Sequence, residues 1–214
     1  MENYNSEYYK AIYGRAIFDE EHYRLKANIS IKKYFKNIPK DIEILDFGCG
    51  LGYNTFFFPN STGFDISEFS LDFCKQKGKK IIKSLDEVKD GTFDVVFSSH
   101  TLEHVEKPFE TLKLLNEKLR TNGKLILVLP VEKYGKSDFE PDSNQHLFLW
   151  NFRTINNLLI RSGFKILENS YRRGYGYDKF NSIAKINLKL FEIITTLTSL
   201  IYGVKELFIV AKKD

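Results

Sequence analysis

Apolar and polar residues follow one another along this chain in blocks that predict strands and helices in alternation. Short apolar runs, typical of buried strands, occur at 42–47, 63–66, 81–83, 94–98, 125–130, 164–168 and 204–211. Helical spacing or helix-capping residues mark 53–59, 67–78, 107–122, 154–162 and 181–201, and two further helices are expected within 6–38. This alternation predicts an α/β fold, with helices on both faces of a mostly parallel sheet.

The segment 44–55 is the part of the pattern that is most informative about function. A short apolar strand runs through Asp46 into Gly48-Cys49-Gly50-Leu51-Gly52, so the strand ends in a loop that carries few side chains. A dinucleotide-binding loop needs the spacing Gly-x-Gly-x-x-Gly, and here the third glycine comes one residue early. Asp46 would repel a pyrophosphate but would accept a hydrogen bond from an ammonium group. The loop therefore favours a positively charged cofactor.

These residues resemble motif I of the class I S-adenosylmethionine-dependent methyltransferases that act on small molecules. Three later segments, 63–67, 93–105 and 125–130, are similar to other motifs of that family and follow in the same order, so the resemblance covers about 40–170. It implies a Rossmann-like seven-stranded sheet in which strand seven runs antiparallel between strands five and six. We expect a single domain over 1–214, with a helical lid at 1–38, a cofactor-binding core at 40–170 and a helical insertion at 171–203.

The resemblance also implies that S-adenosylmethionine is the cofactor and S-adenosylhomocysteine the product. The residues expected at the cofactor are Asp46, Gly48, Cys49, Gly50, Gly52, Asp65, Ile66, Ser84, Leu85, Ser98 and Ser99. Asp65 would hold the ribose hydroxyls, and Asp86 is an alternative to Ser84 and Leu85 beside the adenine. Tyr13, with neighbouring tyrosines and Arg15, would cover the methionyl group, and plain packing is the alternative.

Two histidines are candidates for the general base that methyl transfer to a hydroxyl group needs. His104 follows the fourth predicted strand, and His146 follows a polar segment at 130–144 that we expect to be a substrate loop. A lone histidine is more often structural, so both roles stay open. The run 100–104 also fits the H-x-x-E-H pattern of one zinc peptidase group. It follows directly on a strand rather than lying within a long helix, so we predict no metal.

Charge, cysteine content and the absence of long apolar segments indicate where the protein is located in the cell. The net charge is +4 over 214 residues, and the lysines are spread along the chain apart from a cluster at 75–83 that we interpret as a solvated helix end. The two cysteines predict no disulfide framework, and we expect no secretory signal and no transmembrane segment. These features predict a cytoplasmic protein. The apolar 181–201 helix is expected to pack on the sheet or on a second subunit of a homodimer, with a membrane-surface role as the alternative.

The acceptor is the open question at this stage. Strand four ends in Ser-Ser-His instead of the Asn-Pro-Pro-Tyr type of motif used on nucleobase amino groups, and no RNA-binding module is visible, so we expect no nucleic-acid partner. A small hydroxylated acceptor fits better, and Trp150 with nearby tyrosines is suited to stack on a sugar ring. We predict O-methylation of a sugar or nucleotide-linked sugar in glycan biosynthesis. The alternatives are a lipid or quinone methyltransferase at the membrane surface and a noncatalytic cofactor-binding subunit.

Overall fold

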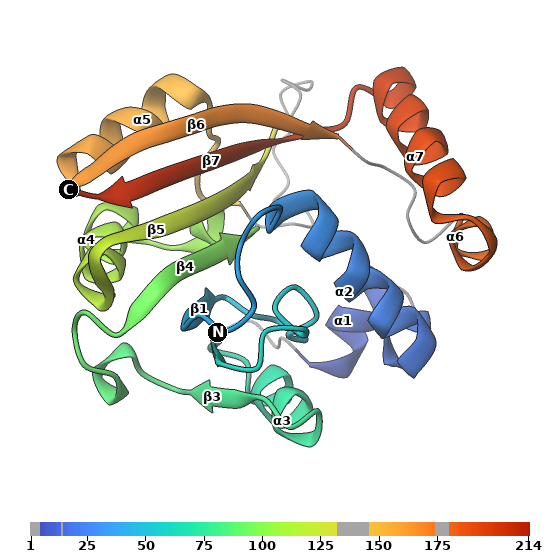
Figure 1. Ribbon diagram of the computed structural model, residues 1–214, viewed down its shortest axis with the longest axis horizontal. Helices are drawn as coiled ribbons and strands as arrows, with labels where there is room; N and C mark the ends of the chain where they lie inside the picture. Colours follow the sequence, from blue (N-terminus) through green and yellow to red (C-terminus); the bar gives the residue numbers. More distant parts are fainter. Residues whose placement is uncertain (1–4, 14, 132–145, 174–179) are drawn as a thin grey trace.

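A seven-stranded sheet forms the centre of the computed structural model, which describes residues 5–13, 15–131, 146–173 and 180–214 (Figure 1). The strands are β1 (Ile44–Phe47), β2 (Ser61–Phe64), β3 (Lys80–Ile82), β4 (Phe93–Ser99), β5 (Leu119–Pro130), β6 (Phe164–Arg173) and β7 (Lys205–Lys213). Their order is β3-β2-β1-β4-β5-β7-β6. The pairs from β3 to β5 are parallel, while β7 is antiparallel to both β5 and β6. The predicted Rossmann-like sheet with an antiparallel seventh strand is confirmed.

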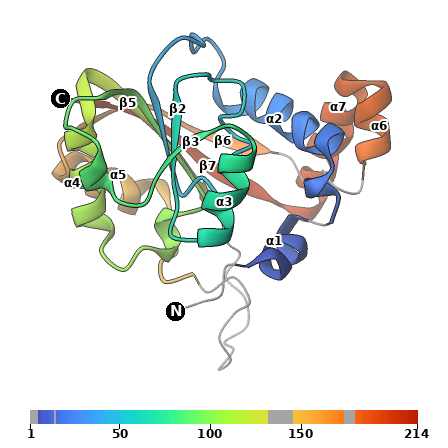
Figure 2. The same ribbon diagram turned by 90° about the horizontal axis from the view of Figure 1, so that it is seen from below.

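Helices cover both faces of this sheet because its central strands are apolar on both sides. In β4, Val96 faces one core, and its neighbours Val95 and Phe97 face the other, as the two-residue repeat of a strand requires. The first core is closed by α4 (Pro108–Lys118) and α5 (Phe152–Arg161), and the second by α2 (Glu20–Tyr34). Figure 2 shows α4 and α5 on one side of the sheet and α2, with α6 (Asn181–Ile186) and α7 (Leu188–Tyr202), on the other.

The two helices expected near the N-terminus are present and lie at the end of the sheet toward which β4 points (Figure 1). They are α1 (Ser6–Tyr13) and α2, joined by the 3₁₀ turn η1 (Arg15–Phe18). Tyr23 of α2 is fully buried, and its hydroxyl donates to the carbonyl oxygen of Leu51 at 2.9 Å. The hydroxyls of Tyr9 and Ser70 share a 2.6 Å hydrogen bond, which joins α1 to α3 (Glu68–Gln76). The N-terminal helices are thus fastened to the glycine loop and to the helix after β2.

Replacing Tyr23 by phenylalanine is expected to lower the free energy of unfolding by about 1–2 kcal/mol, because it leaves the buried Leu51 carbonyl without that donor. Urea denaturation followed by circular dichroism measures the change. Tyr171→Phe is the control, since Tyr171 is 45% exposed and should change the stability by less than about 0.5 kcal/mol. Equal effects of the two substitutions would contradict a structural role for the Tyr23 hydroxyl.

The structure corrects the predicted helix at 53–59, where the chain forms consecutive turns. The Thr55 carbonyl accepts from Phe58 N at 3.0 Å, from Ser61 Oγ at 3.2 Å and from Lys79 Nζ at 3.0 Å. An α-helix would use that carbonyl for the amide four residues later. Because the carbonyl already accepts from these three donors, no helix forms and the segment leads directly into β2. Strand β2 begins at Ser61 and not at residue 63.

Three other boundaries differ from the predicted ones. Helix α4 ends at Lys118 and not near residue 122, because Leu119 already pairs with Phe93 of β4. The predicted 181–201 helix is two helices, separated at Asn187, whose side chain accepts from Leu190 N and caps α7. Strand β6 continues to Arg173, since it pairs with β7 beyond residue 168. The expected substrate loop at 130–144 lies almost entirely outside the described residues.

Candidate active site

The glycine loop after β1 is held against the end of β2 by backbone hydrogen bonds. The amides of Gly48 and Cys49 both donate to the carbonyl oxygen of Phe64, at 2.8 and 2.9 Å. The amide of Gly50 donates to Asp65 Oδ2 at 2.8 Å, and the other oxygen of Asp65 accepts from Ser67 N at 2.9 Å. Burial raises the pKa of the Asp65 carboxyl, and these backbone donors oppose the rise. Asp65 therefore fixes the loop as well as standing at the edge of the site.

A cavity of about 190 Å³ opens over this loop, and we call it the loop cavity. It is lined by Tyr8, Tyr9, Phe47, Gly48, Gly50, Phe64, Asp65, Ile66, Ser99, His100, Thr101, His104 and Val105. At Gly48, whose φ is +74°, a Cβ atom would lie 2.1 Å from Thr101 Oγ1. Backbone therefore forms the wall at this point, as the cradle of a nucleoside cofactor requires. Ile66 is 75% exposed beside Asp65 and offers an apolar surface next to a carboxylate.

A second cavity of about 430 Å³ adjoins the first, and we call it the polar cavity. It is lined by Tyr8, Lys26, Ile29, Ser30, Lys33, Tyr34, Gly48, Cys49, Tyr53, Asn54, Ser99, His100, His104, Pro130, His146 and Glu206. Tyr8, Gly48, Ser99, His100 and His104 line both cavities. A molecule in one cavity would therefore lie close to a molecule in the other, with His104 between them.

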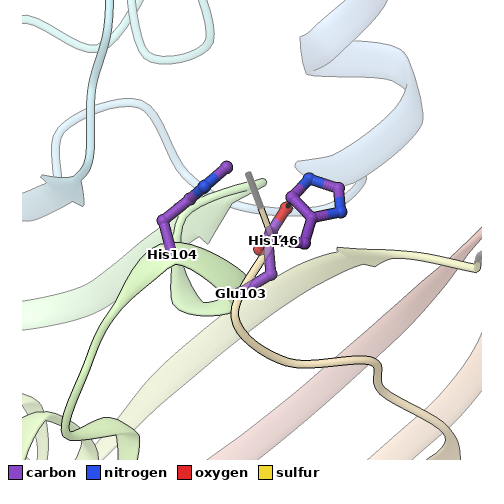
Figure 3. A group of neighbouring side chains, drawn as sticks. All are labelled: Glu103, His104 and His146. Carbon is purple, nitrogen blue, oxygen red and sulfur yellow. Dashed lines mark ion pairs between the residues drawn. The ribbon is translucent and has the colours of Figure 1, made fainter. Parts of the chain in front are cut away.

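Glu103, His104 and His146 come together beside the polar cavity (Figure 3). The rings of His104 and His146 lie edge to face with centroids 4.8 Å apart, and His146 Nε2 is 3.9 Å from Glu103 Oε1. Glu103 and His104 belong to the 3₁₀ turn η3 (Leu102–His104) after β4. The carbonyl oxygen of Glu103 accepts from the amides of Leu147 and Phe148, at 2.9 and 3.3 Å. These bonds hold the His146 segment against η3.

His100 lies between Glu103, whose Oε1 is 3.6 Å from His100 Nδ1, and a set of charges that reaches across to β7. His100 Nε2 is 3.2 Å from Glu206 Oε1, and Lys33 Nζ is 2.6 Å from Glu206 Oε2, which also accepts from the Tyr34 hydroxyl at 3.0 Å. Burial opposes the charged form of His100, but the carboxylates of Glu103 and Glu206 outweigh it and raise its pKa. Because the side chain is 43% exposed, water screens part of this attraction. Burial likewise opposes ionisation of Glu206, yet His100 and Lys33 lower its pKa to about 2.

The structure brings together part of the predicted site. Gly48, Cys49, Gly50, Asp65, Ile66, Ser99, His104 and His146 all line one or both cavities. Tyr8 and Tyr9 lie where the N-terminal lid was expected, whereas the side chain of Tyr13 lies outside the described part of the chain. The cavities also contain residues that the sequence did not single out, namely Lys26, Lys33, Tyr34, Asn54 and Glu206.

Five predicted cofactor residues line neither cavity, and four of them have structural surroundings that explain their placement. Asp46 is buried and accepts from Thr55 Oγ1 at 2.8 Å, and burial raises its pKa to about 6. Ser84 caps a 3₁₀ turn, Leu85 belongs to the core, and a Cβ at Gly52 would meet Cys74 and Lys79. Ser98 is the fifth, buried within β4 with no hydrogen-bond partner for Oγ among the described residues.

Trp150 also lies away from the polar cavity. Its ring stacks on Phe148 at 5.4 Å and packs against the core formed with α4 and α5. The expectation that Trp150 stacks on a sugar ring is therefore wrong for this arrangement. The aromatic side chains at the polar cavity are Tyr8, Tyr34 and Tyr53 among the residues that the structure places.

Comparison with known proteins decides the family. Residues 19–169 match the family model described as a methyltransferase domain, and this stretch is well over half of the chain. The chain belongs to the class I S-adenosylmethionine-dependent methyltransferases. S-adenosylmethionine is the methyl donor of this family, and the bare backbone at Gly48 beside Asp65 fits such a cofactor in the loop cavity.

Two relatives match part of the chain. Over 104 residues the methyltransferase is 41% identical to an uncharacterized protein of Methanocaldococcus jannaschii, covering 45% of this chain and 44% of that protein. Over 105 residues it is 36% identical to a tRNA U34 carboxymethyltransferase of Helicobacter acinonychis, covering 41% of this chain and 40% of that enzyme. The matched segments thus span less than half of either relative.

Two solved methyltransferase structures share the fold. An S-adenosylmethionine-dependent methyltransferase from Archaeoglobus fulgidus superimposes with a TM-score of 0.64 and 21% identity over 97% of this chain and 98% of that one. The 1,6-didemethyltoxoflavin-N1-methyltransferase of Burkholderia thailandensis was solved with 1,6-didemethyltoxoflavin and S-adenosylhomocysteine bound. It superimposes with a TM-score of 0.59 and 15% identity, covering 97% of this chain and 84% of that one. Among the described residues, no helix of this methyltransferase is both long enough and apolar enough to cross a membrane.

Proposed function

We propose that this methyltransferase methylates a hydroxyl oxygen of a small polar acceptor, of the sugar or nucleotide-linked sugar type, in carbohydrate biosynthesis. The observation that carries the proposal is the polar cavity. It adjoins the loop cavity, and its lining supplies ammonium, amide, hydroxyl, imidazole and carboxylate groups from Lys26, Lys33, Asn54, Ser30, Tyr34, His104, His146 and Glu206. A polyhydroxylated acceptor needs such convergent donors and acceptors, and Tyr8 and Tyr53 add rings that can pack on a pyranose face.

The position of His104 supports a role at the acceptor hydroxyl. When bound, S-adenosylmethionine supplies an electrophilic methyl group. His104 lines both cavities, whereas His146 lines only the polar cavity, so His104 lies nearer to the point where donor and acceptor would meet. Either imidazole is suited to hold the hydroxyl group or to accept its proton as the oxygen gains the methyl group. The N-terminal helices, through Tyr8, would close the site over both molecules.

A lipid or quinone acceptor at a membrane surface is a second candidate, favoured by one observation. Helix α7 exposes a row of large apolar side chains, Leu190, Ile193, Leu197, Leu200 and Ile201, which are each about half exposed or more. Such a row is a feature of helices that rest on lipid as well as of subunit contacts. Co-sedimentation with anionic liposomes tests this candidate, and a protein that stays in the supernatant would count against it.

The proposal is tested by incubating the purified chain with radiolabelled S-adenosylmethionine and panels of free sugars, nucleotide sugars, quinols and tRNA. We expect transfer to a nucleotide sugar or sugar, with the product ether located by mass spectrometry. His104→Gln should lower kcat by about 100-fold or more, as loss of a general base or hydroxyl-positioning group does. The affinity for S-adenosylhomocysteine should change by less than about threefold, because few of its contacts would be lost.

His22→Gln is the matched control, since His22 is buried in α2 and lines neither cavity. It should keep kcat, and circular dichroism of each variant checks the fold. Transfer to tRNA or to a quinol alone would overturn the sugar assignment. Full activity of His104→Gln and of His146→Gln would remove both imidazoles from the reaction.

A further inference from the structure

We propose that Glu103, His104 and His146 form a binding site for a divalent transition-series cation, such as Zn²⁺, Mn²⁺ or Fe²⁺, at the wall of the polar cavity. The sequence pattern H-x-x-E-H pairs His100 with His104 and, because it directly follows a strand, does not predict a metal site. In the structure, His100 Nε2 is 3.2 Å from Glu206 Oε1 and His100 Nδ1 is 3.6 Å from Glu103 Oε1, so both of its nitrogens face carboxylates, while His146 lies beside Glu103 and His104. The expectation of no metal considered the pair His100 and His104 and did not include His146.

The first argument is geometric. One ligand atom from each of Glu103, His104 and His146 can be chosen so that all three lie within 4.8 Å of one another (Figure 3). An ion with bonds of about 2.0–2.2 Å to nitrogen and oxygen needs its ligand atoms within roughly 3–4.3 Å of each other. Binding would require the side chains to rotate until that difference is closed. The Leu147 and Phe148 amides, which bind the Glu103 carbonyl, hold the backbone of the His146 segment against that of Glu103.

The second argument is the condition of the Glu103 carboxylate. The side chain is fully buried, and neither oxygen has a hydrogen-bond partner among the described residues. The nearest basic nitrogens are His100 Nδ1 at 3.6 Å and His146 Nε2 at 3.9 Å, both beyond hydrogen-bond length. The ion pair with His100, which His100 shares with Glu206, leaves both oxygens of Glu103 without a hydrogen bond, and a buried carboxylate in that condition is destabilised. A cation between Glu103 and the two imidazoles would provide a partner for these oxygens.

The chemistry of the three ligands selects the class of ion. Two imidazole nitrogens and one carboxylate suit zinc, iron, manganese or cobalt, whereas calcium and magnesium prefer sites made entirely of oxygen. Three protein ligands also leave coordination positions open. His104 and His146 line the polar cavity, so those positions would face the space assigned to the acceptor. The site is therefore of the open kind found in catalytic metal centres rather than the closed structural kind.

The role of this ion rests on the proposed function, although its binding does not. A metal-bound hydroxyl group is more acidic than a free one, so the ion would both orient the acceptor oxygen and ease loss of its proton. The oxygen–hydrogen bond of the acceptor breaks and its proton passes to solvent, while the oxygen forms a bond to the methyl carbon, whose bond to sulfur breaks as S-adenosylhomocysteine leaves with that electron pair. In the loaded protein, His104 and His146 then serve as ligands rather than as bases.

Titration calorimetry of the EDTA-treated full chain with Zn²⁺, and separately with Mn²⁺, tests binding without cofactor or acceptor. We expect one ion per chain. Glu103→Gln and His146→Gln should each weaken binding by more than the roughly 10–100-fold that loss of a second-shell partner causes. Co²⁺ provides an independent readout, because its absorption spectrum separates nitrogen and oxygen ligands from the buried thiols of Cys49 and Cys74.

His100→Gln is the discriminating variant, since it removes the histidine of the sequence pattern but none of the three proposed ligands. It should weaken binding by no more than the roughly 10–100-fold that loss of a second-shell partner causes, because His100 only neighbours the Glu103 carboxylate at 3.6 Å, and so by less than Glu103→Gln or His146→Gln. No ion bound by the wild-type chain, an unchanged affinity in both Glu103→Gln and His146→Gln, or a thiolate spectrum with Co²⁺ would each overturn the site. Binding without any methyl transfer would leave the site standing and count against the proposed function. Transfer that is undiminished in EDTA would overturn the inferred role of the ion.

Discussion

Asp65→Ala is expected to weaken binding of S-adenosylhomocysteine by about 100-fold or more, because each hydrogen bond to a charged group contributes about 1.5–3 kcal/mol. The carboxylate accepts from Gly50 N and Ser67 N, so its removal releases the glycine loop from the end of β2. It also lines the loop cavity, where family resemblance assigns it the ribose hydroxyls. Loop anchoring and cofactor contact are therefore lost together. Titration calorimetry with S-adenosylhomocysteine measures the affinity directly.

Two further variants make the Asp65 result specific. Asp65→Asn keeps one oxygen acceptor and the shape of the side chain, so it should lie between the alanine variant and the wild type. Asp72→Ala removes a carboxylate from the exposed face of α3, where its ion pair is with Lys75, and should leave the affinity within about threefold. Unchanged binding by Asp65→Ala would show that the loop cavity is not the cofactor site.

The parts of the fold that the sequence predicts well are those encoded by neighbouring residues. The strand and turn at 44–52, Asp65 at the end of β2 and the capped start of α3 at Ser67 each depend on a few consecutive side chains. Several such segments occur in the order found in the class I methyltransferases, and the known sheet of that family then predicts the strand order. The antiparallel β7 between β5 and β6 was expected on that ground and is present.

The parts that the sequence does not predict depend on contacts between distant residues. Glu206 meets Lys33 and Tyr34 only because β7 inserts beside β5, which brings its start to the end of α2. One local signal was available, since Glu206 interrupts the apolar run of the last strand. Glu103 and His146 are likewise joined by backbone bonds from Leu147 and Phe148 that no local pattern encodes. The absence of a helix after the glycine loop also depends on a contact between distant residues, because Lys79 Nζ, 24 residues further along the chain, donates to the Thr55 carbonyl.

Gly48→Ala is expected to lower both the free energy of unfolding and the transfer activity strongly, because the added Cβ would overlap the side chain of Thr101. Gly48 and Gly78 have the same φ of +74°, so alanine at either position meets the left-handed strain of about 1–2 kcal/mol. At Gly78 nothing lies within 4 Å of the new Cβ, whereas at Gly48 three side-chain atoms of Thr101 lie at 2.1, 2.4 and 2.7 Å. Gly78→Ala is therefore the matched control for backbone strain.

The difference between the two glycine variants isolates the contact with Thr101. We expect Gly48→Ala to lower the free energy of unfolding by about 2 kcal/mol more than Gly78→Ala, as overpacking of a tight site does, with transfer activity lost. Thr101 directly precedes η3, so displacing it also moves Glu103 and His104. Thr101→Gly removes all three clashing atoms, and its combination with Gly48→Ala should be more stable than the sum of the single effects predicts. Urea denaturation of the four proteins in this cycle measures the coupling, and strictly additive effects would mean that the cost of Gly48→Ala does not come from a clash with Thr101.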